Sequence, residues 1–167
     1  MATIVAGAGL IPFLRAADPE NPAVDPATER TRKQVRMLDD LYKTAIVLVT
    51  THYVNEDSDL AAGDAFQALF KVMKEKGHHE VRLIDATGEP YDEDNTPREG
   101  FEKTGVAKLK AGSVWYDQVI EKDGKKYLQA ATPIPVVMKK CVMCHDNYAN
   151  VPEGQIIGAL SYTIAIE

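Results

Sequence analysis

The sequence predicts an α+β domain in which an antiparallel sheet packs against a long N-terminal helix and a second helix. Three observations lead to this fold class. Two long segments near the N-terminus have apolar residues at helical spacing, and four later segments are rich in β-branched and aromatic residues. An Asp-Gly pair at 123–124 marks a tight hairpin, and strands joined by hairpins and local turns pair antiparallel.

The two N-terminal helices are predicted over residues 26–53 and 60–76, and Gly77 suits the end of the second. In the first helix, apolar residues recur at spacings of three and four, and we expect them to face the core. This stripe consists of Leu38, Leu41, Ala45, Leu48 and His52. The stripe of the second helix consists of Ala62, Phe66, Leu69 and Met73.

The periodicity changes from helical to strand-like at residue 80. Strands are predicted over residues 80–85, 113–121, 126–134 and 155–166, with a short helix over residues 96–110. Pro133 and Pro135 are expected to end the third strand, because proline lacks the backbone N–H that a ladder requires.

The chain of 167 residues is long enough to form one domain with its own core. We expect residues 28–167 to form this domain, and residues 1–27 to be a signal-like leader followed by a Pro-rich linker. Residues 1–14 are mostly apolar or small, as in the central region of a secretory signal. The charged region that normally precedes it is missing, so a disordered apolar tail is the alternative.

Charge and hydropathy argue against two classes of protein. The net charge is −6, and the basic residues are not gathered on one stripe, which argues against a nucleic-acid-binding protein. No apolar run approaches the length that a membrane-spanning helix needs.

The segment Cys141-Val142-Met143-Cys144-His145 reads Cys-x-x-Cys-His, the attachment signal for a c-type haem. The two thiols add to the two vinyl groups of haem, and the histidine that follows offers its imidazole to the iron. These are the only two cysteines in the chain. The motif predicts one haem c per chain, attached outside the cytoplasm, for example in the periplasm.

Other interpretations of the cysteine pair remain open. It suits a redox dithiol at the start of a helix. Half of a zinc site is less well supported, because zinc usually takes four ligands and no second cysteine pair exists. A structural disulfide or two buried cysteines without a task are the remaining alternatives. The histidine directly after Cys144 favours haem.

The sixth position of the iron has several candidate ligands. His52 is the first, because it lies on the apolar stripe of the long helix; the alternative is an ordinary core or surface histidine. The others are His78 and His79, which we expect to be exposed, and Met37, Met73 and Met138, which also suit core packing. A five-coordinate iron would instead leave a place for a diatomic gas.

Apolar residues that enter the loop of the motif are expected to wall the haem, with ordinary core packing as the alternative. These residues are Tyr127, Pro133, Pro135, Val137 and Met138. Three tyrosines are candidates to hydrogen-bond the haem propionates: Tyr53, Tyr91 and Tyr148.

Residues 127–134, the motif at 141–145 and residues 154–161 resemble a family of extracytoplasmic c-type haem domains with a PAS-like fold. This family was long listed as of unknown function, and it occurs alone and as the sensor part of histidine kinases and chemoreceptors. The resemblance extends over residues 31–167. It implies haem binding, a PAS-like antiparallel sheet and an iron ligand from the N-terminal helical part. A cyanobacterial member has His/Cys ligation, which this chain cannot reproduce, because it has no third cysteine.

The resulting hypothesis is a redox-responsive or gas-responsive sensor or binding module that acts through a signalling or redox partner protein. The first alternative is a small soluble electron-transfer cytochrome. The second is an enzyme, in particular a thiol oxidoreductase that uses Cys141 and Cys144. The sequence shows no pairing of a nucleophile with a general base, so we expect no enzyme.

Overall fold

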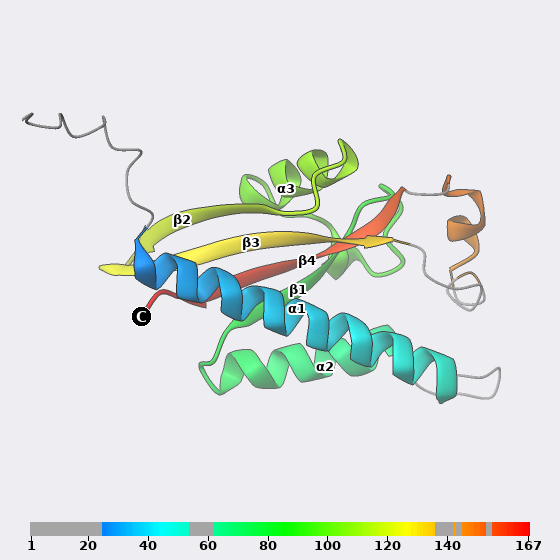
Figure 1. Ribbon diagram of the computed structural model, residues 1–167. Coiled ribbons are helices and arrows are strands. Elements are labelled where there is room, and N and C mark those ends of the chain that lie inside the picture. Colours follow the sequence, from blue (N-terminus) through cyan, green and yellow to red (C-terminus); the bar gives the residue numbers. More distant parts are fainter. Residues whose placement is uncertain (1–24, 54–61, 136–141, 143–144, 153–154) are drawn as a thin grey trace, which may run out of the picture.

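The protein has the predicted α+β architecture (Figure 1). The structure is a computed structural model that describes residues 25–53, 62–135, 142, 145–152 and 155–167. Over these residues the chain forms three α-helices and a four-stranded antiparallel sheet with the strand order β1-β4-β3-β2. The architecture is compatible with a PAS-like fold.

The bounds of the elements follow the predictions closely. The helices are α1 (Pro26–His52), α2 (Ala62–Glu75) and α3 (Phe101–Lys110). The strands are β1 (Glu80–Asp85), β2 (Tyr116–Lys122), β3 (Lys125–Pro135) and β4 (Ile156–Ala165). Two short 3-10 helices also occur, η1 (Glu93–Asn95) and η2 (Asp146–Asn150).

The short helix expected from residue 96 begins later, at Phe101. Residues 93–95 form η1 instead, and the Asp92 side chain caps it by accepting a hydrogen bond from the Asp94 N–H at 2.9 Å. Gly100 precedes α3 with a φ of 85°. A helix cannot run through this left-handed conformation, which glycine adopts readily, so the earlier start was wrong.

The expectation that Pro133 ends the third strand was also wrong. Pro133 lies within β3 and pairs with Ala159 of β4. β2 pairs with β3 only as far as Ala131, so beyond this residue β3 has a ladder partner on one side only. A residue without an N–H is tolerated at such an edge. Pro135 does end the strand, next to a shift in the pairing register.

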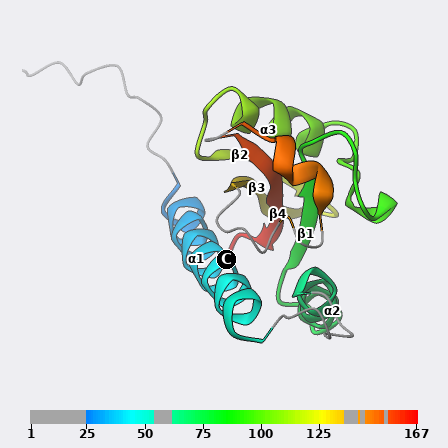
Figure 2. The same cartoon turned by 90° about the vertical axis from the view of Figure 1, so that its right-hand side faces the viewer.

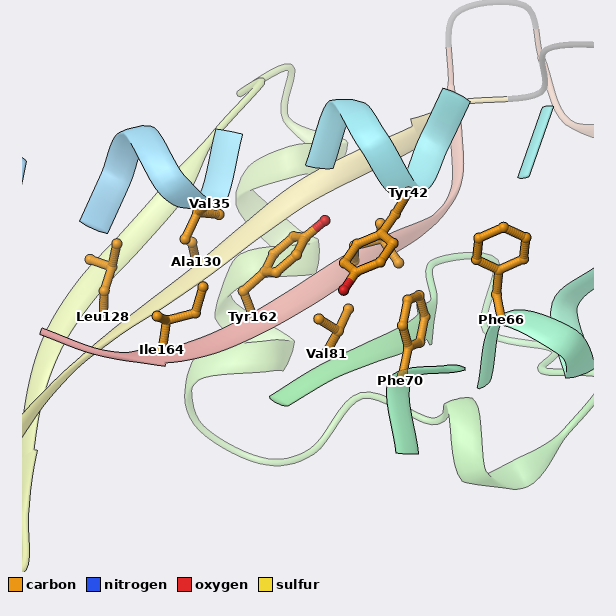
Figure 3. Close-up of a cluster of buried hydrophobic side chains, with 10 residues drawn as sticks. Val35, Tyr42, Phe66, Phe70, Val81, Leu128, Ala130, Tyr162 and Ile164 are labelled. Atoms are coloured by element: carbon orange, nitrogen blue, oxygen red, sulfur yellow. The ribbon is translucent and has the colours of Figure 1, made fainter. Parts of the chain in front are cut away.

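The sheet is covered on both faces, by α1 and α2 on one side and by α3 on the other (Figures 1 and 2). Side chains from both N-terminal helices and from three strands fill the larger core (Figure 3). Its buried members are Val35, Tyr42, Phe66, Phe70, Val81, Leu128, Ala130, Leu160, Tyr162 and Ile164. The smaller core under α3 contains Ile84, Leu109, Ala131 and Ala159.

The buried face of α1 differs from the predicted stripe. Leu38 and Ala45 pack against the core as expected, but Leu41 and Leu48 are 58% and 52% exposed. Most of the core-facing residues of α1 are instead Val35, Leu38, Tyr42, Ala45 and Val49. This set also has spacings of three and four. It is rotated by part of a turn from the predicted stripe, so the side of α1 that carries Leu41 and Leu48 faces away from the core.

A polar network fixes the rotation of α1 on the sheet. Asp39 accepts hydrogen bonds from the Thr132 hydroxyl at 2.5 Å, from the Tyr162 hydroxyl at 2.9 Å and from Lys43 Nζ at 2.8 Å. Burial, together with the charge of Asp39, raises the pKa of Tyr162 well above its usual range. Tyr162 is fully buried, so its hydroxyl needs this partner. The network therefore determines which side chains of α1 point toward the sheet.

None of the helices in the described part of the chain has the length and apolar character that crossing a bilayer requires.

Candidate functional site

The Cys-x-x-Cys-His motif lies in the connection between β3 and β4, two strands that pair with each other. Both ends of this connection are therefore at one end of the sheet (Figure 1). β1 finishes at the same end, because Asp85 pairs with Gly158 near the start of β4. His145 is described by the structure, whereas Cys141, Cys144, Val137 and Met138 lie outside the described residues.

The imidazole of His145 contacts two tyrosine rings. It stacks on Tyr148 with ring centroids 4.5 Å apart and planes 17° apart, and it meets Tyr91 edge to face at 5.6 Å and 81°. His145 precedes η2, in which the Tyr148 N–H donates to the His145 carbonyl at 2.9 Å. The tight turn of η2 thus places Tyr148 against the imidazole, whereas Tyr91 reaches the imidazole from the separate loop after β1.

A small hollow of about 70 Å³ adjoins His145. Its other lining residues come from the ends of three strands and from the loop after β1. Besides the two tyrosines they are Leu83, Ile84, Asp85, Pro90, Asn95, Ile134, Ile157 and Gly158. Burial in this mainly apolar setting lowers the pKa of His145 below its ordinary value of 6.5. The imidazole is therefore neutral at pH 7, the form that binds a metal.

The loop that carries Tyr91 is tied down by the carboxylate of Asp85. This carboxylate accepts hydrogen bonds from the Thr87 hydroxyl at 2.7 Å and from the Gly88 N–H at 2.6 Å. Gly88 has a φ of 93°, which glycine tolerates and which the turn requires. At the far end of the loop, the Asn95 side chain accepts a hydrogen bond from Gln67 of α2 at 3.2 Å. Both ends of the loop are thus anchored to regular elements.

A buried ion pair also holds η1, which lies in the same loop. Arg82 of β1 pairs with Glu102 of α3, and their side chains are only 15% and 9% exposed. Arg82 also donates to the carbonyl of Asp94 in η1 at 2.5 Å. Glu102 in turn accepts the Arg98 N–H at 2.8 Å. The pair joins β1, α3 and η1 around one guanidinium group.

His52 is the last residue of α1, and its side chain is exposed. It follows Ala45 by seven residues and so lies on nearly the same, sheet-facing side of the helix. Lys43 contacts Thr132 at 3.1 Å, and from there α1 advances about 13 Å to His52 while β3 advances about 10 Å to Pro135. The end of α1 and η2 therefore lie at the same end of the sheet (Figures 1 and 2).

The other ligand candidates are less well placed. His78 and His79 precede β1, at the opposite end of this strand from Asp85. His78 is exposed as expected, but His79 is half-buried, with Nε2 2.8 Å from the Tyr42 hydroxyl, so that expectation was wrong for His79. Met37 is 61% exposed on α1 and Met73 is half-buried on α2. Met138 lies outside the described residues.

The predicted wall residues are only partly brought together. Pro133 is half-buried and Pro135 exposed, both near the site, but it is Ile134 between them that lines the hollow, because neighbouring residues of a strand face opposite sides. Tyr127 lies eight residues before Pro135 on the extended strand β3, a separation of about 26 Å. This distance corrects the expectation that Tyr127 walls the site.

Sequence reasoning missed the contributions of β1 and β4 to the site. Ile84 and Asp85 end β1, while Ile157 and Gly158 begin β4. The signal for them was the strand order: once β4 is placed beside β1, the end of one strand meets the beginning of the other. Tyr91 and Tyr148 were expected near the haem propionates, and the structure brings both of them to His145. Tyr53, the third, is 78% exposed at the end of α1.

Comparison with known proteins assigns the chain to a family. No curated protein matches it significantly. Residues 21–164, which include every described helix and almost all of the sheet, match the family model Tll0287-like (Tll0287). On the extent of this match, the chain belongs to the Tll0287-like family.

Proposed function

We propose that the chain is an extracytoplasmic c-type haem protein that acts as a redox-responsive or gas-responsive sensor or binding module. Cys141 and Cys144 hold one haem covalently, and His145 is its axial ligand. The observation that carries the proposal is the neutral, partly buried imidazole of His145 directly after the cysteine pair, against an apolar end of the sheet. Membership of the Tll0287-like family is consistent with a haem-binding, sensor-like domain.

The residues present supply the donor atoms that a c-type haem needs, but the hollow beside His145 is small. Two thiols and one imidazole are the donor set that c-type attachment uses. The hollow of about 70 Å³ is far smaller than the roughly 300 Å³ of pockets that enclose ligands of this size. A haem held by Cys141, Cys144 and His145 would therefore not be enclosed by this hollow. Tyr91 borders the hollow and is 86% exposed, although its ring contacts His145 edge to face.

The bound haem would supply one-electron chemistry and an iron able to take a further ligand. The chain's own residues would set the conditions for it. Tyr148 holds the imidazole plane of His145, and the apolar ends of β1, β3 and β4 exclude water from one side. Their low polarity favours a neutral over a charged axial ligand.

The first test is the haem content of the full chain produced with a c-type maturation system. We expect a coloured protein that keeps about one haem per chain after acid–acetone extraction, because a thioether survives acid while an iron–imidazole bond does not. The absorbance of the pyridine complex measures this content. A colourless protein with thiol–disulfide exchange activity would overturn the proposal in favour of the oxidoreductase.

A small electron carrier is the second candidate, and one observation favours it. The site lies at the end of the sheet beside exposed acidic residues, Glu89, Glu93 and Asp94, so a haem there would have an edge near solvent and a negative rim for docking. Carbon monoxide separates the two functions. A ferrous protein that binds the gas is a gas-responsive module, whereas fast electron exchange without gas binding favours a carrier over a gas-responsive module.

The sixth ligand provides a further prediction. We propose that His52 takes this position, because it lies on the sheet-facing side of α1 at the end of the molecule where His145 lies. The ferric wild type should then be low-spin, and His52→Ala should be high-spin and take up imidazole or cyanide readily. Optical and EPR spectra measure the change. His78→Ala is the control and should leave the spectrum unchanged; a low-spin His52→Ala protein would eliminate His52.

A further inference from the structure

A second cavity, of about 220 Å³, lies along β1, and the haem proposal does not use it. β1 is an edge strand of the sheet, and α2 packs beside it (Figure 2). The cavity is lined by α2, by β1, by η1 and by the chain just before α3. Leu83 and Asn95 line both this cavity and the hollow at His145, so the two lie next to each other.

Part of the cavity lining is apolar. Phe70 of α2 and Val81 of β1 are 4% and 5% exposed, and Leu83 lies two residues after Val81 on the same face of the strand. These three side chains also pack in the larger core, which fixes their positions. A bound molecule would therefore meet a rigid apolar surface here.

The exposed part of the lining has more basic than acidic partners. Lys74 of α2 and Arg98 both approach a single atom, Glu80 Oε1, at 3.2 Å and 3.5 Å. Neither cation forms another ion pair within the part of the chain that the structure describes, and their side chains are 60% and 63% exposed. Two cations thus share one carboxylate oxygen, and a second carboxylate would find both of them as partners.

Arg82 adds a guanidinium group that is held in place. It pairs with Glu102, which is not part of the lining, and it donates to the carbonyls of Asp94 at 2.5 Å and Thr96 at 3.4 Å. Of the five N–H donors of a guanidinium group, these bonds leave two without a partner among the described residues. The lining therefore has spare hydrogen-bond donors as well as spare positive charge.

We propose that this cavity binds a small aliphatic carboxylate, with the carboxylate group at Lys74 and Arg98. Its alkyl stem lies on the apolar surface formed by Phe70, Val81 and Leu83. The two cations select a negative group, and the planar guanidinium of Arg98 matches the geometry of a carboxylate. The volume is below the roughly 300 Å³ at which pockets begin to hold drug-sized ligands, which favours a stem of a few carbons. So small a molecule makes few contacts, and we expect a dissociation constant of about 1 mM.

Amide chemical shifts of the matured full chain, followed by NMR while butyrate is added to about 50 mM at constant ionic strength, test the proposal. The shifts of Val81, Asn95 and Arg98 should move together, with a dissociation constant of about 1 mM. Acetate, which lacks two of the methylenes, should bind about 10-fold more weakly. Butylammonium has a similar stem with the opposite charge and should leave these amides unshifted.

Substitutions at the charged residues test the role of each group. Glu80→Gln should tighten butyrate binding by about 5-fold, because it removes the carboxylate that competes for Lys74 and Arg98. A folding defect cannot mimic this gain. Lys74→Ala with Arg98→Ala should weaken binding by at least about 10-fold. The matched control, Lys122→Ala with Lys125→Ala, removes two exposed lysines of the β2–β3 hairpin and should bind like the wild type.

Amides that stay unshifted up to about 50 mM butyrate would overturn the proposal, and so would equal affinities for Glu80→Gln and the wild type. Equal losses in the two double variants would contradict it, because binding would then follow net charge alone. Shifts confined to residues 145–150 would also overturn it, since the probe would then bind at the His145 site. Haem attachment is measured separately, by haem content after acid–acetone extraction, so this proposal and the haem proposal fail independently.

Discussion

Replacing Cys141 and Cys144 together with alanine is expected to remove covalently bound haem, from about one per chain to about none. The reason is that only the two thiols of this chain can form thioethers. His145 remains in the double variant, but its bond to iron does not survive acid–acetone extraction. Haem content after extraction, measured as the pyridine complex and divided by protein concentration, gives the result directly.

The motif itself offers the control for this experiment. Val142→Ala with Met143→Ala changes the two residues between the cysteines and leaves both thiols and His145 in place. This variant should retain covalent haem near the wild-type level. Covalent haem at the wild-type level in the Cys141→Ala, Cys144→Ala protein would show that the motif is not the attachment site.

The second large effect is a loss of stability when the buried ion pair between Arg82 and Glu102 is broken. Glu102→Ala should lower the free energy of unfolding by about 3–5 kcal/mol, because Arg82 would be left charged and unpaired while its side chain is only 15% exposed. The backbone N–H of Arg98 would lose its acceptor as well. Urea denaturation followed by circular dichroism measures the difference in unfolding free energy.

Glu99→Ala is the matched control for Glu102→Ala. Glu99 also pairs with a basic residue, Lys103, but the two side chains are 85% and 56% exposed. Such a surface pair contributes at most about 0.5 kcal/mol, so this variant should unfold like the wild type. Equal losses for Glu99→Ala and Glu102→Ala would mean that the burial of the Arg82–Glu102 pair has no energetic weight. Glu102→Gln should lie between the two, since its amide oxygen still accepts from Arg82.

The fold was predictable because its signals are local. The Asp-Gly turn at 123–124 gives the β2–β3 hairpin, and Asp123 indeed has a positive φ of 53° there. The side of α1 that faces the core was not predictable from periodicity alone. Two rows with the same spacing run along this helix, and the choice between them depends on Asp39, whose partners Thr132 and Tyr162 come from strands far along the chain.

The donors of the candidate site stay a prediction from the sequence, and its surroundings could be predicted only in part. Cys141, Cys144 and His145 are predicted from their spacing, which needs no knowledge of the fold, and the structure describes only His145 among them. The wall of the hollow depends on which strand ends meet, and this is decided by the pairing of β1 with β4. Tyr127 was misplaced because nearness in sequence was taken for nearness in space, although an extended strand carries its two ends far apart.

His145 lies beyond the end of the strands, so a structural change at this residue need not extend into the sheet. η2 is held by single turns such as the bond from the Tyr148 N–H to the His145 carbonyl, whereas β3 and β4 are joined along their whole length. Segments with few backbone bonds open at a small fraction of the global unfolding free energy. A change at His145 can therefore rearrange η2 as a separate cooperative unit, while amide protons of the central strands keep their protection from exchange.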